Sequence, residues 1–431
     1  MHSGLSALGQ RTAAPPVSWL MRLTLDHPRL ISLAAGFTDN AALPVAHTRQ
    51  LLQEILASPK LARPALQYGS TVGDPQLRHL TAAHLQSADG QFCSRAGAQI
   101  YSPDRLLITN GSQQLLYMVT EVLCDPGDIV LVEDPTYFVF LGILQSHGVQ
   151  CRAIHLQEDG LDTEHLADTL RALHRSGQLP RVKMLYVVSY YQNPTGITTS
   201  PQKKAAILRV LRQFEKAAGH QLYLLEDAAY RELRFAGPDV PSALAVESDP
   251  SRVIYAGTFS KPFATGARVG FGLLPAELLE AVARVKGNHD FGSANLLQQL
   301  LARALASGRY QAHVTSVAKR YAQKAALMCA MLRAHFPAAV QWTPPQGGLY
   351  VWARLPQRVA TGFKSNVFKA ALKRQVLYVP GELCYADDPT RPKPRHEMRL
   401  SFGGATPKDI RLGIQRLGQV LSQVAGRWAR A

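Results

Sequence analysis

Lys261 stands in a sequence setting that suits covalent chemistry with an aldehyde. It closes the run Thr258-Phe259-Ser260-Lys261, and Arg268 follows a short distance later. A lysine amine forms a Schiff base with an aldehyde, and the adjacent hydroxyls and cation suit a phosphate on the same molecule. This order of residues favours a lysine that binds a phosphate-bearing aldehyde cofactor. A pyridoxal-phosphate enzyme is therefore the leading interpretation.

Four residues outside this run suit the aromatic ring of such a cofactor. A buried carboxylate keeps a pyridinium nitrogen protonated, and Asp227 follows an apolar run. Tyr230 and Asn193 are candidates for hydrogen bonds to the ring oxygen, and Tyr137 is a candidate for stacking on the ring face. Each also has an ordinary explanation when taken alone. Asn193 opens a turn-forming Asn-Pro-Thr-Gly sequence, and Tyr137 resembles a core aromatic residue.

Two further motifs could bind anions. Gly111-Ser112-Gln113 begins a helical pattern, and the free N–H groups of a helix N-terminus bind phosphate, although an ordinary capped turn reads the same way. Arg399 interrupts the apolar run of residues 398–402. A buried arginine without a partner is costly, so Arg399 predicts either a bound substrate carboxylate or an intramolecular salt bridge.

The elements expected to position these residues alternate between strands and helices. Strands are expected at residues 106–109, 129–133, 184–189, 222–226, 253–257 and 269–274. Strands separated by long helical segments predict an α/β fold with a mostly parallel sheet covered by helices. Most of the candidate residues follow the ends of these strands, where open α/β sheets bind ligands. One shared site is therefore expected.

The chain divides into three parts. Residues 1–50 are expected to form an N-terminal arm, with a helix over 17–25, that joins the smaller domain. Residues 51–310 are expected to form a large cofactor-binding domain. Residues 311–431 contain helical patterns at 313–336, 364–374 and 407–428 with short strands between them, which predicts a small α+β domain.

Composition narrows the classes of protein. Hydrophobic residues make up 46% and charged residues 18%, which is too apolar for a disordered chain. The net charge is +16, but no long block of like charge and no docking motif accompanies it, so no nucleic-acid partner is expected. The N-terminus lacks a signal-peptide pattern, and no apolar stretch is long enough to span a membrane, so no membrane association is expected.

Cysteine and histidine patterns argue against metal sites. The five cysteines (Cys93, Cys124, Cys151, Cys329 and Cys384) are scattered and include no C-x-x-C pair, so neither zinc binding nor a disulfide framework is expected. The 14 histidines show no ligand spacing, and no metal is expected. Reduced thiols in a cytoplasmic protein are the simpler interpretation.

The order of several segments resembles a known family. The segments are Ser18-Trp19-Leu20-Met21-Arg22, residues 31–36, Gln67-Tyr68-Gly69, residues 109–114, residues 192–196, residues 226–233, residues 345–352 and residues 398–402. In this order the chain resembles the fold-type I pyridoxal-phosphate enzymes of aminotransferase class I and II. It is most similar to the branch with 2-aminoadipate, kynurenine and aromatic or branched-chain aminotransferases. The resemblance implies a seven-stranded sheet in the large domain.

The resemblance also implies a role for each matching residue. Lys261 would carry the internal aldimine and move the proton, Asp227 would pair with the pyridine nitrogen, and Asn193 and Tyr230 would bind the ring oxygen. Tyr137 would stack on the ring. The phosphate would be bound by Ser112, Gln113, Thr258, Ser260 and Arg268, with Tyr68 of the partner subunit. One departure is Ala228, which replaces a second aspartate that the branch often has after the first.

For the substrate, the resemblance implies that Arg399 and Asn193 bind the α-carboxylate and that Gly36 lines the pocket. Arg22 matches a position that can meet an acidic side chain, whereas Trp19, Leu20 and Phe291 permit a hydrophobic one. The donor therefore stays open between 2-aminoadipate, aromatic and branched-chain amino acids.

The expected activity is a ping-pong transfer of the α-amino group to a 2-oxoacid such as 2-oxoglutarate, catalysed by a homodimer with shared active sites. Two alternatives remain. The first is a lyase, decarboxylase or racemase that uses the same cofactor. The second, a regulator that fuses this fold to a DNA-binding winged helix, is less favoured because fewer than about 30 residues precede the family segments.

Overall fold

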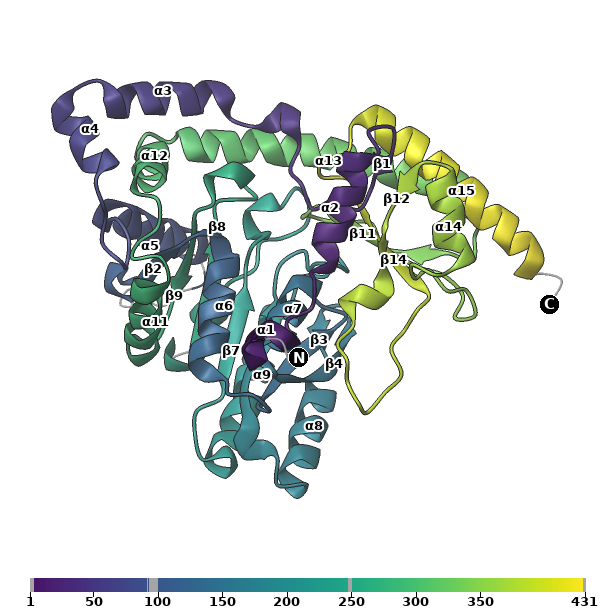
Figure 1. The fold of residues 1–431 in the computed structure, drawn as a ribbon, viewed down its shortest axis with the longest axis horizontal. Coiled ribbons are helices and arrows are strands. Elements are labelled where there is room, and N and C mark those ends of the chain that lie inside the picture. Colours follow the sequence, from purple (N-terminus) through teal and green to yellow (C-terminus); the bar gives the residue numbers. More distant parts are fainter. Residues whose placement is uncertain (1–3, 91, 93–99, 247–249, 429–431) are drawn as a thin grey trace.

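A mixed β-sheet of eight strands forms the centre of the larger part of the molecule (Figure 1). The resemblance implied seven strands, and the sheet has one more because the two-residue β5 pairs with β4 at its edge. The computed structural model describes residues 4–90, 92, 100–246 and 250–428. The strands lie in the order β2-β9-β8-β7-β6-β3-β4-β5. Their bounds are β2 Leu106–Thr109, β3 Ile129–Asp134, β4 Gln150–Gln157, β5 Gly160–Leu161, β6 Val182–Val188, β7 Tyr223–Asp227, β8 Val253–Thr258 and β9 Gly270–Leu273.

The pairing in this sheet confirms the predicted mostly parallel, helix-covered α/β architecture. Strands β8, β7, β6, β3 and β4 pair in parallel. Strand β9 runs antiparallel to both of its neighbours, and the two-residue β5 folds back on β4 as a hairpin. Every residue of β3 and β8 is buried, as expected when helices cover both faces of a parallel sheet.

The helices of the larger part lie on both faces of the sheet and at its β2 edge. They are α3 Val45–Leu56, α4 Pro59–Leu66, α5 Pro75–Asp89, α6 Gly111–Leu123, α7 Phe138–His147, α8 Thr163–Arg175, α9 Pro201–Ala218, α10 Ala243–Val246, α11 Ala276–His289 and α12 Asn295–Ala306. Helix α6 contacts β8 and β9, and α8 contacts β4. Packing of these helices against the sheet fixes the positions of the strand ends at which the candidate residues lie.

A glycine permits the close approach of α6 to the sheet. Gly111 begins α6 with a positive φ of 71°, and β9 passes beside it at Gly270. A Cβ atom at Gly270 would lie 2.4 Å from the backbone nitrogen of Ser112. Only a glycine at this position allows the start of α6 to lie directly against the strand. The N–H groups of α6 are thereby held close to the ends of β2 and β8.

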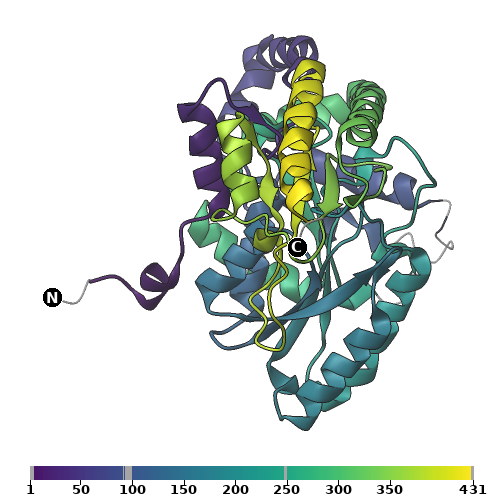
Figure 2. The same cartoon turned by 90° about the vertical axis from the view of Figure 1, so that its right-hand side faces the viewer.

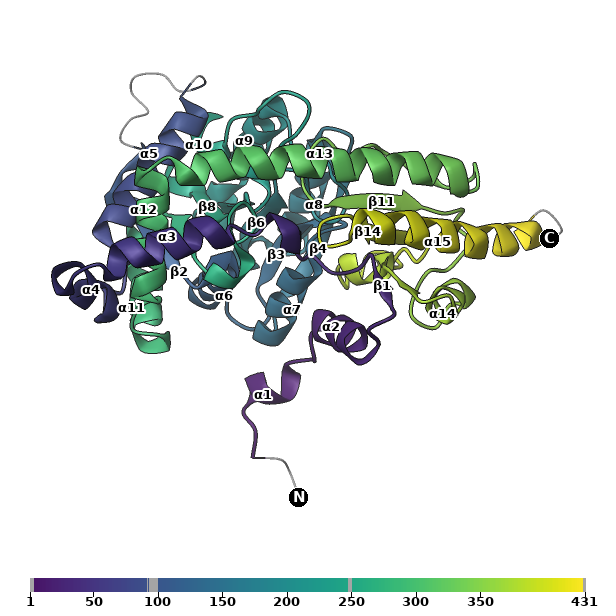
Figure 3. The ribbon, with the colours of Figure 1, turned by 90° about the horizontal axis from the view of Figure 1, so that it is seen from above.

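A smaller body forms around a four-stranded antiparallel sheet of order β10-β11-β14-β13. Its elements are α13 Arg309–His335, β10 Gln341–Trp342, β11 Tyr350–Arg354, α14 Asn366–Lys373, β12 Val376–Leu377, β13 Val379–Pro380, β14 Glu397–Ser401 and α15 Pro407–Trp428. Helix α13 extends from the larger part into this body and packs against α15 (Figure 3). The expected α+β character of the C-terminal region is confirmed.

The N-terminal arm joins the smaller body. Strand β1 (Ile31–Ser32) pairs in parallel with β12 of that body. Helix α2 (Pro16–Asp26) precedes it, and the short α1 (Ala7–Arg11) projects away from the body (Figure 2). The domain boundaries at residues 50/51 and 310/311 stay predictions.

Three observations bear on the excluded classes. Within the described ranges, no helix is both long enough and apolar enough to cross a membrane. Cys124, Cys151, Cys329 and Cys384 are free thiols, while Cys93 lies outside the described residues. Across the same ranges, no cluster of three or more His, Cys, Asp or Glu side chains could hold a metal ion.

Candidate active site

The carboxyl ends of the parallel strands surround a cavity of about 140 Å³. Asp227 ends β7, Thr258 ends β8, and Tyr137 and Asn193 follow β3 and β6. The residues that line the cavity are Gly111, Ser112, Gln113, Tyr137, Val188, Asn193, Asp227, Ala229, Tyr230, Thr258, Ser260, Lys261 and Arg268. Every residue predicted to bind the cofactor, except Tyr68, is in this set. The structure therefore brings together ten residues that are far apart in the sequence.

Asp227 lies buried at the floor of this cavity. Tyr186 donates a hydrogen bond of 2.9 Å to its Oδ2 atom, and the backbone N–H of Ala229 donates one of 3.0 Å to Oδ1. Burial raises the pKa of Asp227 to about 6, although both hydrogen bonds favour the ionised form. A positively charged ring nitrogen in the cavity would favour the ionised carboxylate further.

Lys261 lines the same cavity and follows the end of β8, the strand that pairs with the one that carries Asp227. Its Nζ atom donates a hydrogen bond of 2.9 Å to the carbonyl oxygen of Gly36. Burial lowers the pKa of Lys261, and the nearby Arg268 and Arg399 lower it further. A lowered pKa increases the fraction of neutral amine, which is the form that attacks an aldehyde and accepts a proton.

A chain of hydrogen bonds links the ring side of the cavity to Arg399. The Asn193 amide donates to the Tyr230 hydroxyl over 3.4 Å, and the Tyr230 and Tyr350 hydroxyls are 3.0 Å apart. Arg399 donates to Asn193 Oδ1 over 2.7 Å and to the carbonyl oxygen of Ala34 over 2.7 Å. Burial raises the pKa of Tyr230 well above its ordinary value, so this phenol keeps its proton and can donate it in a hydrogen bond.

The end of the cavity at α6 has the donor set of a phosphate site. The Ser260 hydroxyl is buried and has no hydrogen-bond partner in the structure, which is costly unless a ligand satisfies it. Thr258, the start of α6 and the Arg268 guanidinium lie around the same end. Arg268 has a left-handed backbone with φ of 50°. A hydroxyl without a partner, helix N–H groups and a guanidinium fit the phosphate of an aldehyde cofactor.

A second cavity of about 220 Å³ adjoins the first, and Lys261, Asn193, Tyr230 and Arg268 line both. Its outer wall is mainly apolar and is formed by α2, by residues 34–37 and by the start of α7. Four residues on one face of α2 line this cavity: Val17, Leu20, Met21 and Thr24. Arg399 lies at its inner end, stacked 4.2 Å from the Tyr350 ring centroid. This arrangement suits a carboxylate with an apolar substituent.

The structure places two predicted residues away from these cavities. The Tyr68 side chain is 82% exposed and packs its ring against Phe291, 5.4 Å between centroids, outside its own chain's site. Arg22 is exposed, and its position on α2 is offset from the face that lines the cavity. Of the predicted substrate residues, Arg399, Asn193 and Gly36 do line the second cavity.

Sequence reasoning missed residues that support the site from behind. Tyr186 lies within β6 and binds Asp227, and Tyr350 begins β11 and binds Tyr230. Glu133 accepts hydrogen bonds from the Gln192 amide at 2.9 Å and from the backbone N–H of Val188 at 3.0 Å. Burial raises the pKa of Glu133 to about 8. The only sequence signal for Tyr186, Tyr350 and Glu133 was a polar group within an apolar strand. The same signal had identified Arg399.

Comparisons with known proteins agree with this geometry. The family model described as aminotransferase class I and II matches residues 28–417. Aromatic-amino-acid aminotransferase 1 of Thermococcus litoralis is 31% identical over 97% of this chain and 93% of its own length.

Two solved structures are similar over nearly the whole chain. Kynurenine aminotransferase of Pyrococcus horikoshii, crystallised with PMP, matches with a TM-score of 0.87 at 30% identity, covering 98% of this chain and 97% of that one. LysN, the α-aminoadipate aminotransferase of Thermus thermophilus, was solved with N-(5′-phosphopyridoxyl)-L-leucine. It matches with a TM-score of 0.84 at 28% identity, covering 98% of each chain.

Proposed function

Because this chain belongs to the aminotransferases of class I and II, which use pyridoxal 5′-phosphate, we propose that it transfers the α-amino group of amino acids with apolar side chains to a 2-oxoacid. The observation that carries the choice of donor is the wall of the second cavity. Val17, Leu20 and Met21 of α2 present apolar atoms to it, and Arg399 stands at its inner end. When the substrate carboxylate is bound at Arg399, a substrate side chain that extends to this α2 wall meets carbon atoms rather than a cation.

The cofactor residues follow from the first cavity. Asp227 binds the ring nitrogen, Asn193 and Tyr230 bind the ring oxygen, and Tyr137 stacks on the ring. Ser112, Gln113, Thr258, Ser260 and Arg268 bind the phosphate. When bound, pyridoxal phosphate supplies an electron sink that weakens the bonds at the substrate's α-carbon. Support for this assignment comes from the Ser260 hydroxyl without a partner and from the buried Asp227 carboxylate that lines the same cavity.

The chain's own residues perform binding and proton transfer. Arg399 binds the substrate carboxylate through its forked guanidinium, whose Nε atom is buried and has no protein partner. The ε-amine of Lys261 takes the proton from the substrate's α-carbon, because its lowered pKa provides the neutral amine. With the cofactor bound, the resulting ammonium would deliver this proton to the C4′ carbon of the cofactor. A 2-oxoacid such as 2-oxoglutarate then accepts the amino group in the second half of a ping-pong cycle.

We also propose that the active enzyme is a homodimer in which Tyr68 reaches the phosphate in the partner's cavity. The exposed Val45 and Leu56 of α3, Leu66 of α4 and Tyr68 just after it support a shared interface, because these two helices contact each other and an exposed apolar patch marks a contact surface. Mixing inactive Lys261→Ala chains with weakened Tyr68→Ala chains should restore activity, since one site in each mixed dimer has both residues. Failure of mixed dimers to recover activity would contradict this shared site.

A donor panel tests the proposed substrate class. The cofactor-loaded protein would be assayed with 2-oxoglutarate and with leucine, phenylalanine, 2-aminoadipate or aspartate as donor. The apolar donors should have kcat/KM values at least about tenfold above those of the acidic donors. A preference for the acidic donors would contradict the substrate class, and no amino transfer from any donor would contradict the proposed function as a whole.

A further inference from the structure

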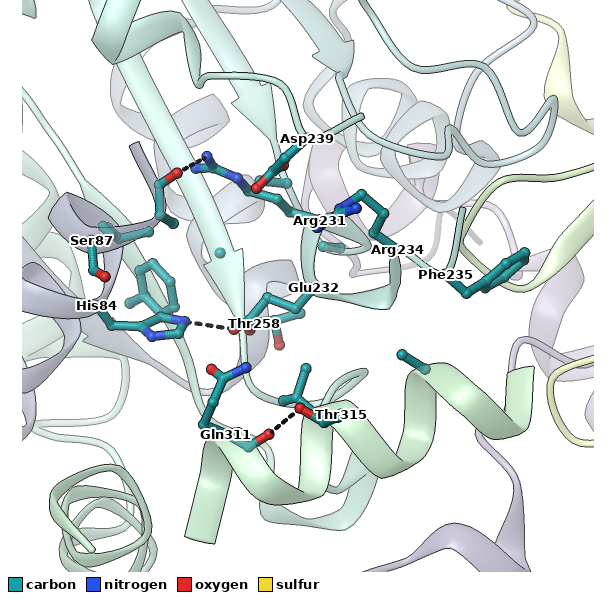
Figure 4. A pocket seen from close by; sticks show the side chains of 18 of the residues that line it. His84, Ser87, Arg231, Glu232, Arg234, Phe235, Asp239, Thr258, Gln311 and Thr315 are labelled. Atoms are coloured by element: carbon teal, nitrogen blue, oxygen red, sulfur yellow. Dashed lines mark hydrogen bonds and ion pairs between the residues drawn. The ribbon is translucent and has the colours of Figure 1, made fainter. Parts of the chain in front are cut away.

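A third cavity, of about 550 Å³, lies behind the cofactor site (Figure 4). Figure 4 shows His84 and Ser87 of α5, the segment after β7, the end of β8 and helix α13 around it. Gln311 and Thr315 of α13 face it from below. A volume of this size lies within the range of sites that bind small metabolites. None of the roles proposed above uses this cavity.

The buried charges on its wall are already neutralised. Glu232 contacts His84 at 2.5 Å and also accepts a hydrogen bond from the Tyr310 hydroxyl. Arg231 also lines the cavity, and it pairs at 2.5 Å with Asp89, which does not. Because each has an oppositely charged partner, the Glu232 carboxylate and the Arg231 guanidinium add little net charge to the wall. The affinity of the cavity for a ligand must therefore come from other groups.

Two cations on the wall have no carboxylate partner. Arg234 donates one hydrogen bond, to the carbonyl oxygen of Gly237 over 3.0 Å, and Lys319 projects from α13. Both side chains are exposed, and in the described part of the chain neither lies within ion-pair distance of an acid. Asp239 is the one remaining acid on the wall and binds the backbone N–H of Val240. The unpaired groups therefore carry net positive charge.

We propose that this cavity binds a small organic anion through a carboxylate or phosphate group held by Arg234 and Lys319. A guanidinium with an ammonium group is the arrangement that recognises such groups. Gln311, Thr315 and Ser87 supply neutral hydrogen-bonding groups for the rest of the molecule. The walls from Val314, Phe235 and Phe271 accommodate a short carbon chain.

A ligand in this cavity would touch the segments that form the cofactor site. Thr258 and Ala229 line both cavities, and Ala228, the residue after Asp227, lines the third cavity. Helix α13, which extends into the smaller body, forms the opposite wall. Binding of a ligand in the third cavity should therefore shift the absorption of the bound cofactor, because the ligand would contact the backbone at Thr258 and next to Asp227.

Isothermal titration calorimetry of the cofactor-loaded protein tests the site directly, in a buffer without phosphate. The probes are citrate, which carries carboxylates, and glycerol 3-phosphate, which carries a phosphate. The test variant is Arg234→Ala/Lys319→Ala. The matched control, Arg209→Ala/Lys216→Ala, removes the same two charges from exposed positions on α9. Ala318→Phe fills the cavity without changing the charge, and Arg399→Ala reports on binding in the substrate cavity.

At least one probe should bind to the wild type, to Arg209→Ala/Lys216→Ala and to Arg399→Ala with similar affinity. Binding should weaken at least about tenfold in Arg234→Ala/Lys319→Ala and in Ala318→Phe. The probe that binds tells which anionic group the site takes. The proposal is overturned if neither probe binds, if the control double variant loses binding equally, or if only Arg399→Ala loses it. This readout does not depend on amino transfer, so it stands apart from the proposed function.

Discussion

The cofactor cavity and the substrate cavity are neighbours, but they are built from different kinds of structure. Strand ends and the start of α6 supply the first, and its polar groups are fixed by hydrogen bonds such as Tyr186 to Asp227. Part of the outer wall of the second comes from α2, a helix in which only Leu20 is buried. The proposed reactive groups thus belong to the packed sheet, whereas groups proposed to meet the substrate side chain belong to an arm helix with one buried residue. If these proposals hold, substitutions on α2 should change donor choice more than reaction type.

Removal of the amine in the cofactor cavity should have the largest effect. In Lys261→Ala, amino transfer should fall by at least about 10⁴-fold, because covalent attachment and proton transfer are both lost. The visible absorption of the lysine-bound cofactor should disappear as well. Spectroscopy and a coupled assay measure both quantities, with Lys216→Ala as the control. Retention of the band and the activity would show that another residue holds the cofactor.

Replacement of the Asp227 carboxylate in the same cavity should weaken catalysis without loss of the bound cofactor. Asp227→Asn should lower kcat by about 10²- to 10³-fold, because the ring nitrogen loses the charge that keeps it protonated. The phosphate contacts remain, so the cofactor should still bind. Steady-state kinetics and cofactor titration separate the two effects. An unchanged kcat would mean that Asp227 does not face the ring nitrogen.

The same substitution should have the opposite effect on stability in the cofactor-free protein. Burial raises the pKa of Asp227 from 3.8 to about 6, so the folded state binds the proton more tightly than the unfolded state. The cost of ionising the buried carboxyl therefore develops as the pH rises from 4 to 6 and is fully present above that. This cost is at most about 3 kcal/mol.

Urea unfolding of both proteins at several pH values measures this cost. The free energy of unfolding of Asp227→Asn should exceed that of the wild type at pH 8, and the difference should shrink towards zero near pH 4. A difference that does not depend on pH would contradict the burial argument.

Truncation of the Arg399 guanidinium, which lines the second cavity, should affect substrate binding more than cofactor binding. Arg399→Ala should raise KM by about 10²-fold, because the substrate carboxylate loses a bidentate partner in a buried site. Arg399→Lys should recover part of the loss, since it keeps the charge without the forked geometry. Kinetics measure the change, and the cofactor spectrum should stay that of the wild type. A KM unaffected by both substitutions would place the carboxylate elsewhere.

Two adjacent residues of α2 should differ in their effect on donor choice. Met21 lines the substrate cavity, and Arg22 lies off that face of the helix. Met21→Arg should raise the ratio of kcat/KM for 2-aminoadipate over leucine by about tenfold, because it places a cation at the apolar wall. Arg22→Ala should change this ratio by less than about twofold. The reverse result would show that Arg22 turns into the cavity when substrate binds.

Much of the cofactor cavity could be predicted from the sequence because its residues follow apolar strands. Asp227, Asn193 and Thr258 each come at or just after a buried β-run, and parallel strands bring such positions to one edge. Strand β4 had no predicted counterpart, because it lies next to the edge of the sheet and only Ala153 and Ile154 of its residues are buried. Its mixed polar sequence resembles a connection more than the continuous apolar runs of β3 and β6.

Other parts of the site depend on contacts that only the folded chain reveals. Tyr350 and Tyr230 are far apart in the sequence and meet because β11 of the smaller body faces the segment after β7. The face of α2 that lines the substrate cavity depends on how the arm docks through β1 and β12. The position of Tyr68 relative to a partner's cavity requires a second chain. Its role therefore stays a prediction.

A single half-reaction tests the central claim most directly. The cofactor-loaded protein is mixed with leucine alone, and the oxoacid, ammonia and carbon dioxide that form are measured together with the absorption spectrum. We predict about one equivalent of oxoacid per active site, a matching spectral change, and continued turnover only after a 2-oxoacid is added. Continuous release of ammonia or carbon dioxide without an added 2-oxoacid, or an unchanged spectrum, would contradict amino transfer at Lys261.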